Sequence, residues 1–319
     1  MSALRATQIV AALSIAAASA SPLAASTCPA GVNTNCAATQ SCCPTFESLT
    51  GFGCCNIPGG VCCPASSTTQ GCCPPGSQCV TAGYDTICVP SGGGPNTTGA
   101  HVCPPGAQFP PSHASLPSII TIGDSVSEGY EPVLAANLST IAFIQHSPFS
   151  DGGGADDVFH GVDCQENFLR TAMYAEAGWD AITFNFGLHD LTNTSANYAA
   201  YESALTNFTA RLQETSAKLL YISTTPMMEL QWFGNNAPTD LNAIAKRVMA
   251  KAGVPYADLY SHIVAYCGAR YSSCDICDNE PWPAGPNTPP GAHCGYHYTP
   301  AGYSYIVEFL GPLVAALVK

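Results

Sequence analysis

The second half of the chain alternates between short apolar runs and amphipathic stretches. The apolar runs predict strands at 118–123, 140–146, 181–187, 218–224 and 254–260. Between the third and fourth runs, apolar residues recur at spacings of three and four and predict a helix through Tyr198, Tyr201, Leu205, Phe208 and Leu212. Further helices are expected after Asp240 and at the C-terminal end. Strands that alternate with helices favour a parallel sheet covered on both faces, that is, a three-layer α/β/α sandwich occupying residues 118–319.

Residues 28–88 follow a different pattern, because they contain 12 cysteines and very few large apolar side chains. Eight of the cysteines form four adjacent pairs, and the only charged residues are Glu47 and Asp85. Such a segment cannot bury enough apolar surface to fold alone, so cross-links must stabilise it. Its cysteine order resembles the granulin (epithelin) module, which implies a small disulfide-rich stack of β-hairpins. Zinc binding is the competing interpretation of dense cysteines.

The N-terminal residues 1–20 contain one arginine, an apolar stretch and the small-residue site Ala18-Ser19-Ala20, which is typical of a secretory signal peptide. An uncleaved membrane anchor is the alternative, and no other stretch is expected to cross a bilayer. Secretion agrees with an even count of 18 cysteines and with four glycosylation sequons, at Asn96, Asn137, Asn193 and Asn207. We therefore expect an extracellular, disulfide-bonded glycoprotein.

Charge and linker composition add two expectations. The net charge of −13 disfavours nucleic acid or anionic membranes as partners. Residues 89–117 are rich in Gly, Pro and Ser and are expected to be a linker, with Cys103 anchoring it to one domain.

Ser125 lies in the segment Gly-Asp-Ser-Val-Ser, at the turn from the first predicted strand into a helix. By itself this serine fits a helix cap as well as a nucleophile, and the surrounding residues do not form the G-x-S-x-G elbow. The segment resembles the first block of the GDSL/SGNH hydrolase family. The C-terminal segment CGYHYTPAGYSYIVEFL is similar to that family's last block, which implies that His297 is the catalytic base.

The same resemblance implies the residues of an oxyanion hole. The loop after the second strand offers a glycine N–H, with Gly153 preferred over its two glycine neighbours. The segment Gly-Leu-His-Asp after the third strand puts His189 where the family has a donating asparagine, and Asn185 is the other candidate donor. Asp190 is expected to brace the loop.

The position of the family's catalytic acid is occupied by Cys294. Two alternatives follow: a Ser-His dyad oriented by a backbone carbonyl, or an acid recruited from Asp275, Asp278 or Glu280. The four cysteines from 267 to 294 are expected to brace the loop that carries His297, together with Cys164 or Cys103.

The resemblance to SGNH hydrolases, whose fold is flavodoxin-like, implies a serine carboxylester hydrolase that forms an acyl-serine intermediate and needs neither cofactor nor metal. The expected substrate is an acyl ester of a carbohydrate or lipid, with short acetyl groups on extracellular polysaccharide preferred. A lipase for longer chains is one alternative. The other is a non-catalytic secreted protein that binds or signals through the granulin-like module, whose partner would be an extracellular protein or a cell wall.

Overall fold

The structure is a computed structural model that describes most of the chain from residue 36 onwards. The described residues are 36, 40–44, 52–55, 57–63, 71–82, 85–91, 100–103, 115–148, 154–169, 178–191, 194–227, 237–268, 274–278 and 295–319. The expected signal peptide at 1–20, Asn96 and Asn193 lie outside these ranges.

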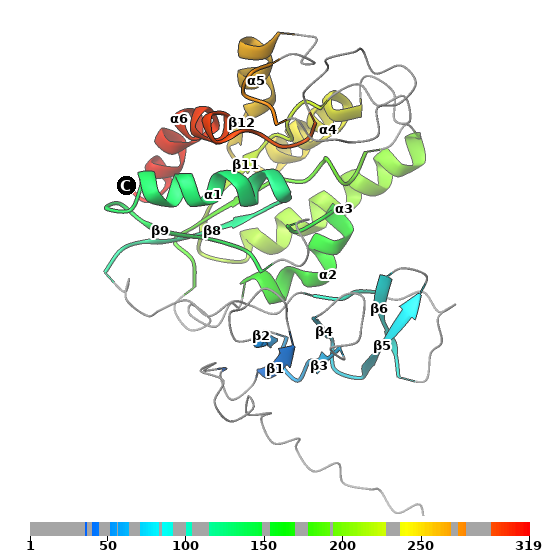
Figure 1. Ribbon diagram of the computed structural model, residues 1–319. Helices are drawn as coiled ribbons and strands as arrows, with labels where there is room; N and C mark the ends of the chain where they lie inside the picture. The colour runs from blue at the N-terminus through cyan, green and yellow to red at the C-terminus, as the bar shows by residue number, and fades with distance from the viewer. Residues whose placement is uncertain are drawn as a thin grey trace, which may run out of the picture.

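Five parallel strands form the central sheet of the larger domain (Figure 1). In chain order they are β8 (Ser118–Ile122), β9 (Phe143–His146), β10 (Ala181–Phe184), β11 (Lys218–Ile222) and β12 (Tyr256–Ala257). Their order across the sheet is β12-β11-β10-β8-β9. Every residue of β8 and β10 is buried, because these central strands are covered on both faces. The predicted parallel sheet is confirmed, although each strand is shorter than the apolar run that predicted it.

Within the described residues, six helices cover the two faces of this sheet. They are α1 (Ser125–Asn137), α2 (Val158–Leu169), α3 (Ser195–Gln213), α4 (Ala237–Ala252), α5 (Leu259–Cys267) and α6 (Pro300–Leu317). The apolar faces of α2, α3 and α4 share one core cluster, and those of α1, α5 and α6 share the other. The two clusters lie on opposite faces of the sheet, with α1 and α6 on one side and α2 and α3 on the other (Figure 1). The predicted α/β/α sandwich is therefore confirmed.

Helix α6 is long and apolar enough to cross a membrane by length and composition alone. This corrects the expectation that no stretch after the N-terminal segment has that character. In the fold, Ile306, Leu310 and Val314 are buried in the core shared with α1. The apolar composition of α6 thus serves the packing of the sandwich.

The cysteine-rich segment forms short antiparallel strands joined by a regular series of disulfides. The strands are β1 (Ser41–Pro44), β2 (Phe52–Cys55), β3 (Val61–Cys62), β4 (Cys72–Cys73), β5 (Ser77–Ala82), β6 (Asp85–Pro90) and β7 (Ala100–His101). The bridges are Cys36–Cys54, Cys43–Cys62, Cys55–Cys72, Cys63–Cys79 and Cys73–Cys88. Each bridge joins neighbouring segments, and buried half-cystines fill most of the interior of this module.

The module is joined to the sandwich at α2. Strand β7, which lies within the stretch expected to be a linker, pairs with β6, and Cys103 exchanges two backbone hydrogen bonds with Cys72. Cys103 then forms a disulfide with Cys164 of α2, and Asp163 accepts a hydrogen bond from the backbone N–H of His101 at 2.9 Å. Because Cys103 and Cys164 bridge each other, the expectation that either braces the loop of His297 is wrong.

Candidate active site

Ser125 is the first residue of α1 and directly follows the turn after β8. Asp124 caps the helix, because its side chain accepts a hydrogen bond from the N–H of Val126 at 3.1 Å. Strands β8 and β10 are neighbours, and the chain winds outward from them in opposite directions. In sheets of this type the carboxyl ends of such strands border the ligand crevice. The serine hydroxyl therefore lies at a helix N-terminus, at the carboxyl edge of the sheet, where partial positive charge favours a developing anion.

His297 lies beside this serine, with its Nε2 atom 2.7 Å from the Oγ atom of Ser125. Backbone pairing holds the segment that carries it: the N–H of Asp278 donates to the carbonyl of His297, and the N–H of Thr299 donates to the carbonyl of Ile276. Thr299 also caps α6. Two residues that are 172 positions apart in the sequence are thus brought within hydrogen-bond distance.

The candidate acids differ in their surroundings. The carboxylate of Asp275 faces Tyr266 of α5 and raises the pKa of that phenol. Asp278 is joined to His297 through the backbone. Glu280 and Cys294 lie outside the described residues. The bridge Cys267–Cys274 ties this segment to the end of α5, and Cys277 is disulfide-bonded as well.

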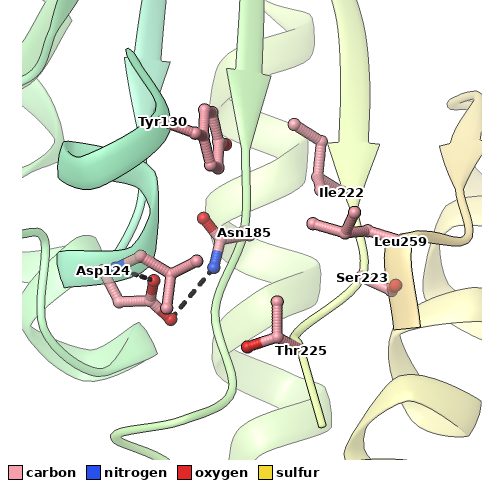
Figure 2. A pocket seen from close by; sticks show the side chains of 8 residues that line it. Asp124, Tyr130, Asn185, Ile222, Ser223, Thr225 and Leu259 are labelled. Carbon is pink, nitrogen blue, oxygen red and sulfur yellow. Dashed lines mark hydrogen bonds between the residues drawn. The ribbon is translucent and has the colours of Figure 1, made fainter. Parts of the chain in front are cut away.

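Asn185, just after β10, is turned towards Asp124 (Figure 2). Its Nδ2 atom donates to Oδ2 of Asp124 at 3.1 Å. Burial raises the pKa of Asp124, whereas the charge of His189 and the hydrogen bonds from Val126 and Asn185 oppose that rise. The amide donor of Asn185 is therefore engaged with the residue that caps the helix of Ser125.

A glycine loop packs directly on the turn that precedes Ser125. Gly154 has φ of +64°, and a Cβ atom added there would overlap the carbonyl oxygen of Gly123. The next residue, Ala155, donates its N–H to that same carbonyl at 2.6 Å. The loop after β9 is thus in contact with the candidate nucleophile's turn, and Gly154 is the position that only glycine fits. Gly153 lies outside the described residues.

His189 is held by a carboxylate that the sequence reasoning missed. Its Nδ1 atom lies 3.0 Å from Oδ1 of Asp156, and 36% of its side chain is exposed. Burial lowers the pKa of His189, but the hydrogen bond to Asp156 and the nearby carboxylates of Asp124 and Asp190 outweigh it and raise the pKa overall. The available signal in the sequence was the pair Asp156 and Asp157, which lies just after the glycine run expected to supply an oxyanion donor.

Asp190 accepts a hydrogen bond from the backbone N–H of Val158, the first residue of α2, at 3.0 Å. Burial raises the pKa of this carboxyl to about 8. Asp190 thus joins the loop after β10 to the start of α2.

A small cavity is lined by Asp124 and Asn185 together with side chains from α1 and from the end of β11 (Figure 2). It has room for about one water molecule. Its apolar lining comes from Val126, Tyr130, Ile222 and Leu259, and its polar lining from Asp124, Asn185, Ser223 and Thr225.

Three clusters of cysteines have sulfur atoms close enough to share a metal ion. All their members, however, are disulfide-bonded and offer no thiolate ligand. In the part of the chain that the structure describes, no other group of histidine, cysteine and carboxylate side chains has this proximity.

Comparison with known proteins identifies the family of the chain. Residues 119–310 match the GDSL-like lipase/acylhydrolase family, and the protein belongs to this family. A search of curated proteins gave no match.

Among solved structures, the lipase/acylhydrolase of Enterococcus faecalis is similar, with 16% identity, a TM-score of 0.48 and coverage of 64% of this chain and 98% of that one. The acetyl xylan esterase AlAXEase has 14% identity and a TM-score of 0.45, and the match covers 62% of this chain and 99% of that one. A variant of an acetyl xylan esterase from Geobacillus stearothermophilus has 11% identity and a TM-score of 0.46, and the match covers 64% of this chain and 95% of that one.

Proposed function

We propose that the protein is a secreted serine carboxylester hydrolase that works through an acyl-serine intermediate. The observation that carries this proposal is the 2.7 Å distance between Oγ of Ser125 and Nε2 of His297 at the N-terminus of α1. A serine hydroxyl becomes a useful nucleophile when a base accepts its proton and when donors receive the oxyanion. Membership of the GDSL-like lipase/acylhydrolase family supports a hydrolase.

In the proposed reaction, Oγ of Ser125 attacks the ester carbonyl carbon while its proton passes to Nε2 of His297. The resulting oxyanion lies at the start of α1, near the glycine loop and His189. When the tetrahedral intermediate collapses, His297 returns the proton to the departing alcohol and an acyl-serine remains. A water molecule, deprotonated by His297, then releases the carboxylic acid and restores the serine.

We further propose that the substrate carries short acyl groups, such as acetyl esters of extracellular polysaccharide. The small cavity lined by Asp124, which precedes Ser125, has room for about one water molecule, a size that suits an acetyl group better than a long acyl chain. The disulfide-bonded module and the net charge of −13 suit an extracellular protein with a polar substrate.

The hydrolase proposal is tested by labelling the secreted protein with a fluorophosphonate probe and mapping the modified peptide. We expect label on Ser125 in the wild type, none in Ser125→Ala, and strongly reduced labelling in His297→Gln. Ser304→Ala is the matched control, because Ser304 is an exposed serine on α6 whose hydroxyl bonds to a carbonyl of its own helix. Equal labelling of wild type and Ser125→Ala, or none in either, would contradict the proposal and favour the non-catalytic binding protein.

The substrate class is tested separately with p-nitrophenyl esters of increasing chain length. Highest kcat/KM on the acetyl ester is expected. A preference for chains of about eight carbons or more would instead support the lipase alternative, without affecting the assignment of Ser125.

A further inference from the structure

We propose that Asp156 is a positioning residue that makes His189 a cationic hydrogen-bond donor for the reaction at Ser125. This inference rests on the proposed esterase function and adds to it a residue and a protonation state.

The geometry of the loop before α2 supports this role. Asp156 follows Gly154 and Ala155, which are in contact with Gly123 in the turn that precedes Ser125. Its backbone adopts φ of +57°, a left-handed conformation that aspartate and asparagine tolerate better than most residues. Because its neighbours are bonded to the turn of Ser125, Asp156 holds its partner His189 at the same edge of the sheet.

Both carboxylate oxygens of Asp156 contact histidines. Oδ1 lies 3.0 Å from Nδ1 of His189, and Oδ2 lies 3.3 Å from Nδ1 of His160. His160 is almost fully buried in α2, with 5% exposed, and its ring stacks on that of His101 in the module. The orientation of the carboxylate is therefore set by a rigid helix, and the carboxylate in turn orients the imidazole of His189.

The chemistry follows from which nitrogen carries a proton. A carboxylate accepts the N–H at Nδ1, so in the neutral ring Nε2 has a lone pair and cannot donate. Nε2 becomes a donor only when the ring is an imidazolium. The carboxyl groups that face His189 among the described residues are Asp156, Asp124 and Asp190. The hydrogen bond to Asp156 is the main cause that raises the pKa of His189 in spite of its partial burial. Asp156 thus sets both the direction of the ring and its protonation.

This arrangement makes the oxyanion donor depend on pH in a way that a neutral asparagine would not. As pH rises through the pKa of His189, the ring loses its proton and stabilisation of the oxyanion weakens. The pH profile therefore has a descending limb that belongs to His189.

The test is the pH profile of kcat for hydrolysis of an acetyl ester, with the rate measured from the acid released. It compares the wild type with Asp156→Asn, His189→Asn and Asp163→Asn. Asp156→Asn keeps the size and the tolerated backbone conformation but removes the charge, so we expect the descending limb to move to lower pH by about one unit. His189→Asn supplies a donor that does not titrate, so the limb should disappear from the pH profile, whatever the level of kcat. Asp163→Asn is the matched control, because Asp163 pairs with His101 of the module, and the limb should not move.

A descending limb at the same pH in wild type and Asp156→Asn, a limb that persists in His189→Asn, or a wild type without any such limb overturns the inference. Circular dichroism verifies that each variant is folded. If Asp156→Asn fails to fold, the His189→Asn profile still decides whether the descending limb belongs to His189. Failure of the proposed function is a separate result, because it appears as absence of probe label on Ser125 in the wild type.

Discussion

Removing the Cys103–Cys164 disulfide should destabilise the sandwich more than removing the Cys267–Cys274 disulfide. The first bridge spans 61 residues of sequence and the second spans 7. The longer loop contains β8, α1 and β9, and with them Ser125 at the start of α1. In the chain-entropy account, the closed loop restricts the unfolded chain, and the stabilisation grows with its length.

That relation gives about 4 kcal/mol for the longer loop and about 2 kcal/mol for the shorter one. Alanine is the suitable replacement for each cysteine, because Cys103 and Cys164 are fully buried and a serine hydroxyl there would add a separate cost. The assay is urea unfolding of the Cys103→Ala/Cys164→Ala and Cys267→Ala/Cys274→Ala double variants. Helical circular dichroism reports the sandwich, because in the described residues all helices belong to it.

The comparison of the two variants carries the test. Loop length accounts for a difference of about 2 kcal/mol. Lost packing adds to it, because Cys103 and Cys164 are fully buried whereas Cys267 is only partly buried. If the Cys103→Ala/Cys164→Ala protein is no less stable than the Cys267→Ala/Cys274→Ala protein, the loop-closure reasoning is refuted. The bridge would then serve only to keep the module attached.

Two further predictions concern the candidate site. Gly154→Ala should lower kcat at least about tenfold, because the new methyl group would displace the loop from Gly123. Gly178→Ala is the control, because Gly178 also has a positive φ, +75°, but has open space around it. Equal losses of kcat in the two variants would attribute the effect to backbone strain alone. Asp190 binds a proton in the folded protein between its unfolded pKa and about 8, so it contributes stability at low pH that is lost as pH rises through about 8. Asp190→Asn should therefore reduce the fall in unfolding free energy between about pH 4 and pH 8, measured by urea titration, and an unchanged slope would contradict this assignment.

The sheet was predictable because its central strands are buried on both faces. Continuous apolar runs such as Ser118–Ile122 and Ala181–Phe184 stand between glycines and polar turns, so their type and order can be read from the sequence. Their ends could not be read, because apolar residues continue past the last sheet hydrogen bond. Phe186, for example, is fully buried but lies beyond β10.

The Ser125–His297 pair was predictable because each residue lies in its own recognisable segment at the end of a strand or the start of a helix. The contacts around it were not. That Asn185 donates to Asp124, and that His189 is bound by Asp156, depends on side-chain orientation and on a left-handed backbone at one position. Periodicity carries no information about either.

Helix α2 connects the two halves of the molecule. Its middle carries Cys164 and Asp163, which hold the module, and its first residue, Val158, is capped by Asp190 from the loop of His189. Eight of the 12 residues of α2 are buried in the described structure, so close packing holds the helix rigidly from end to end. The module is therefore anchored on the same rigid element that supports the loop beside Ser125. A cross-link at α2 stabilises that support, whereas a cross-link at α3 or α4 would leave it to packing alone.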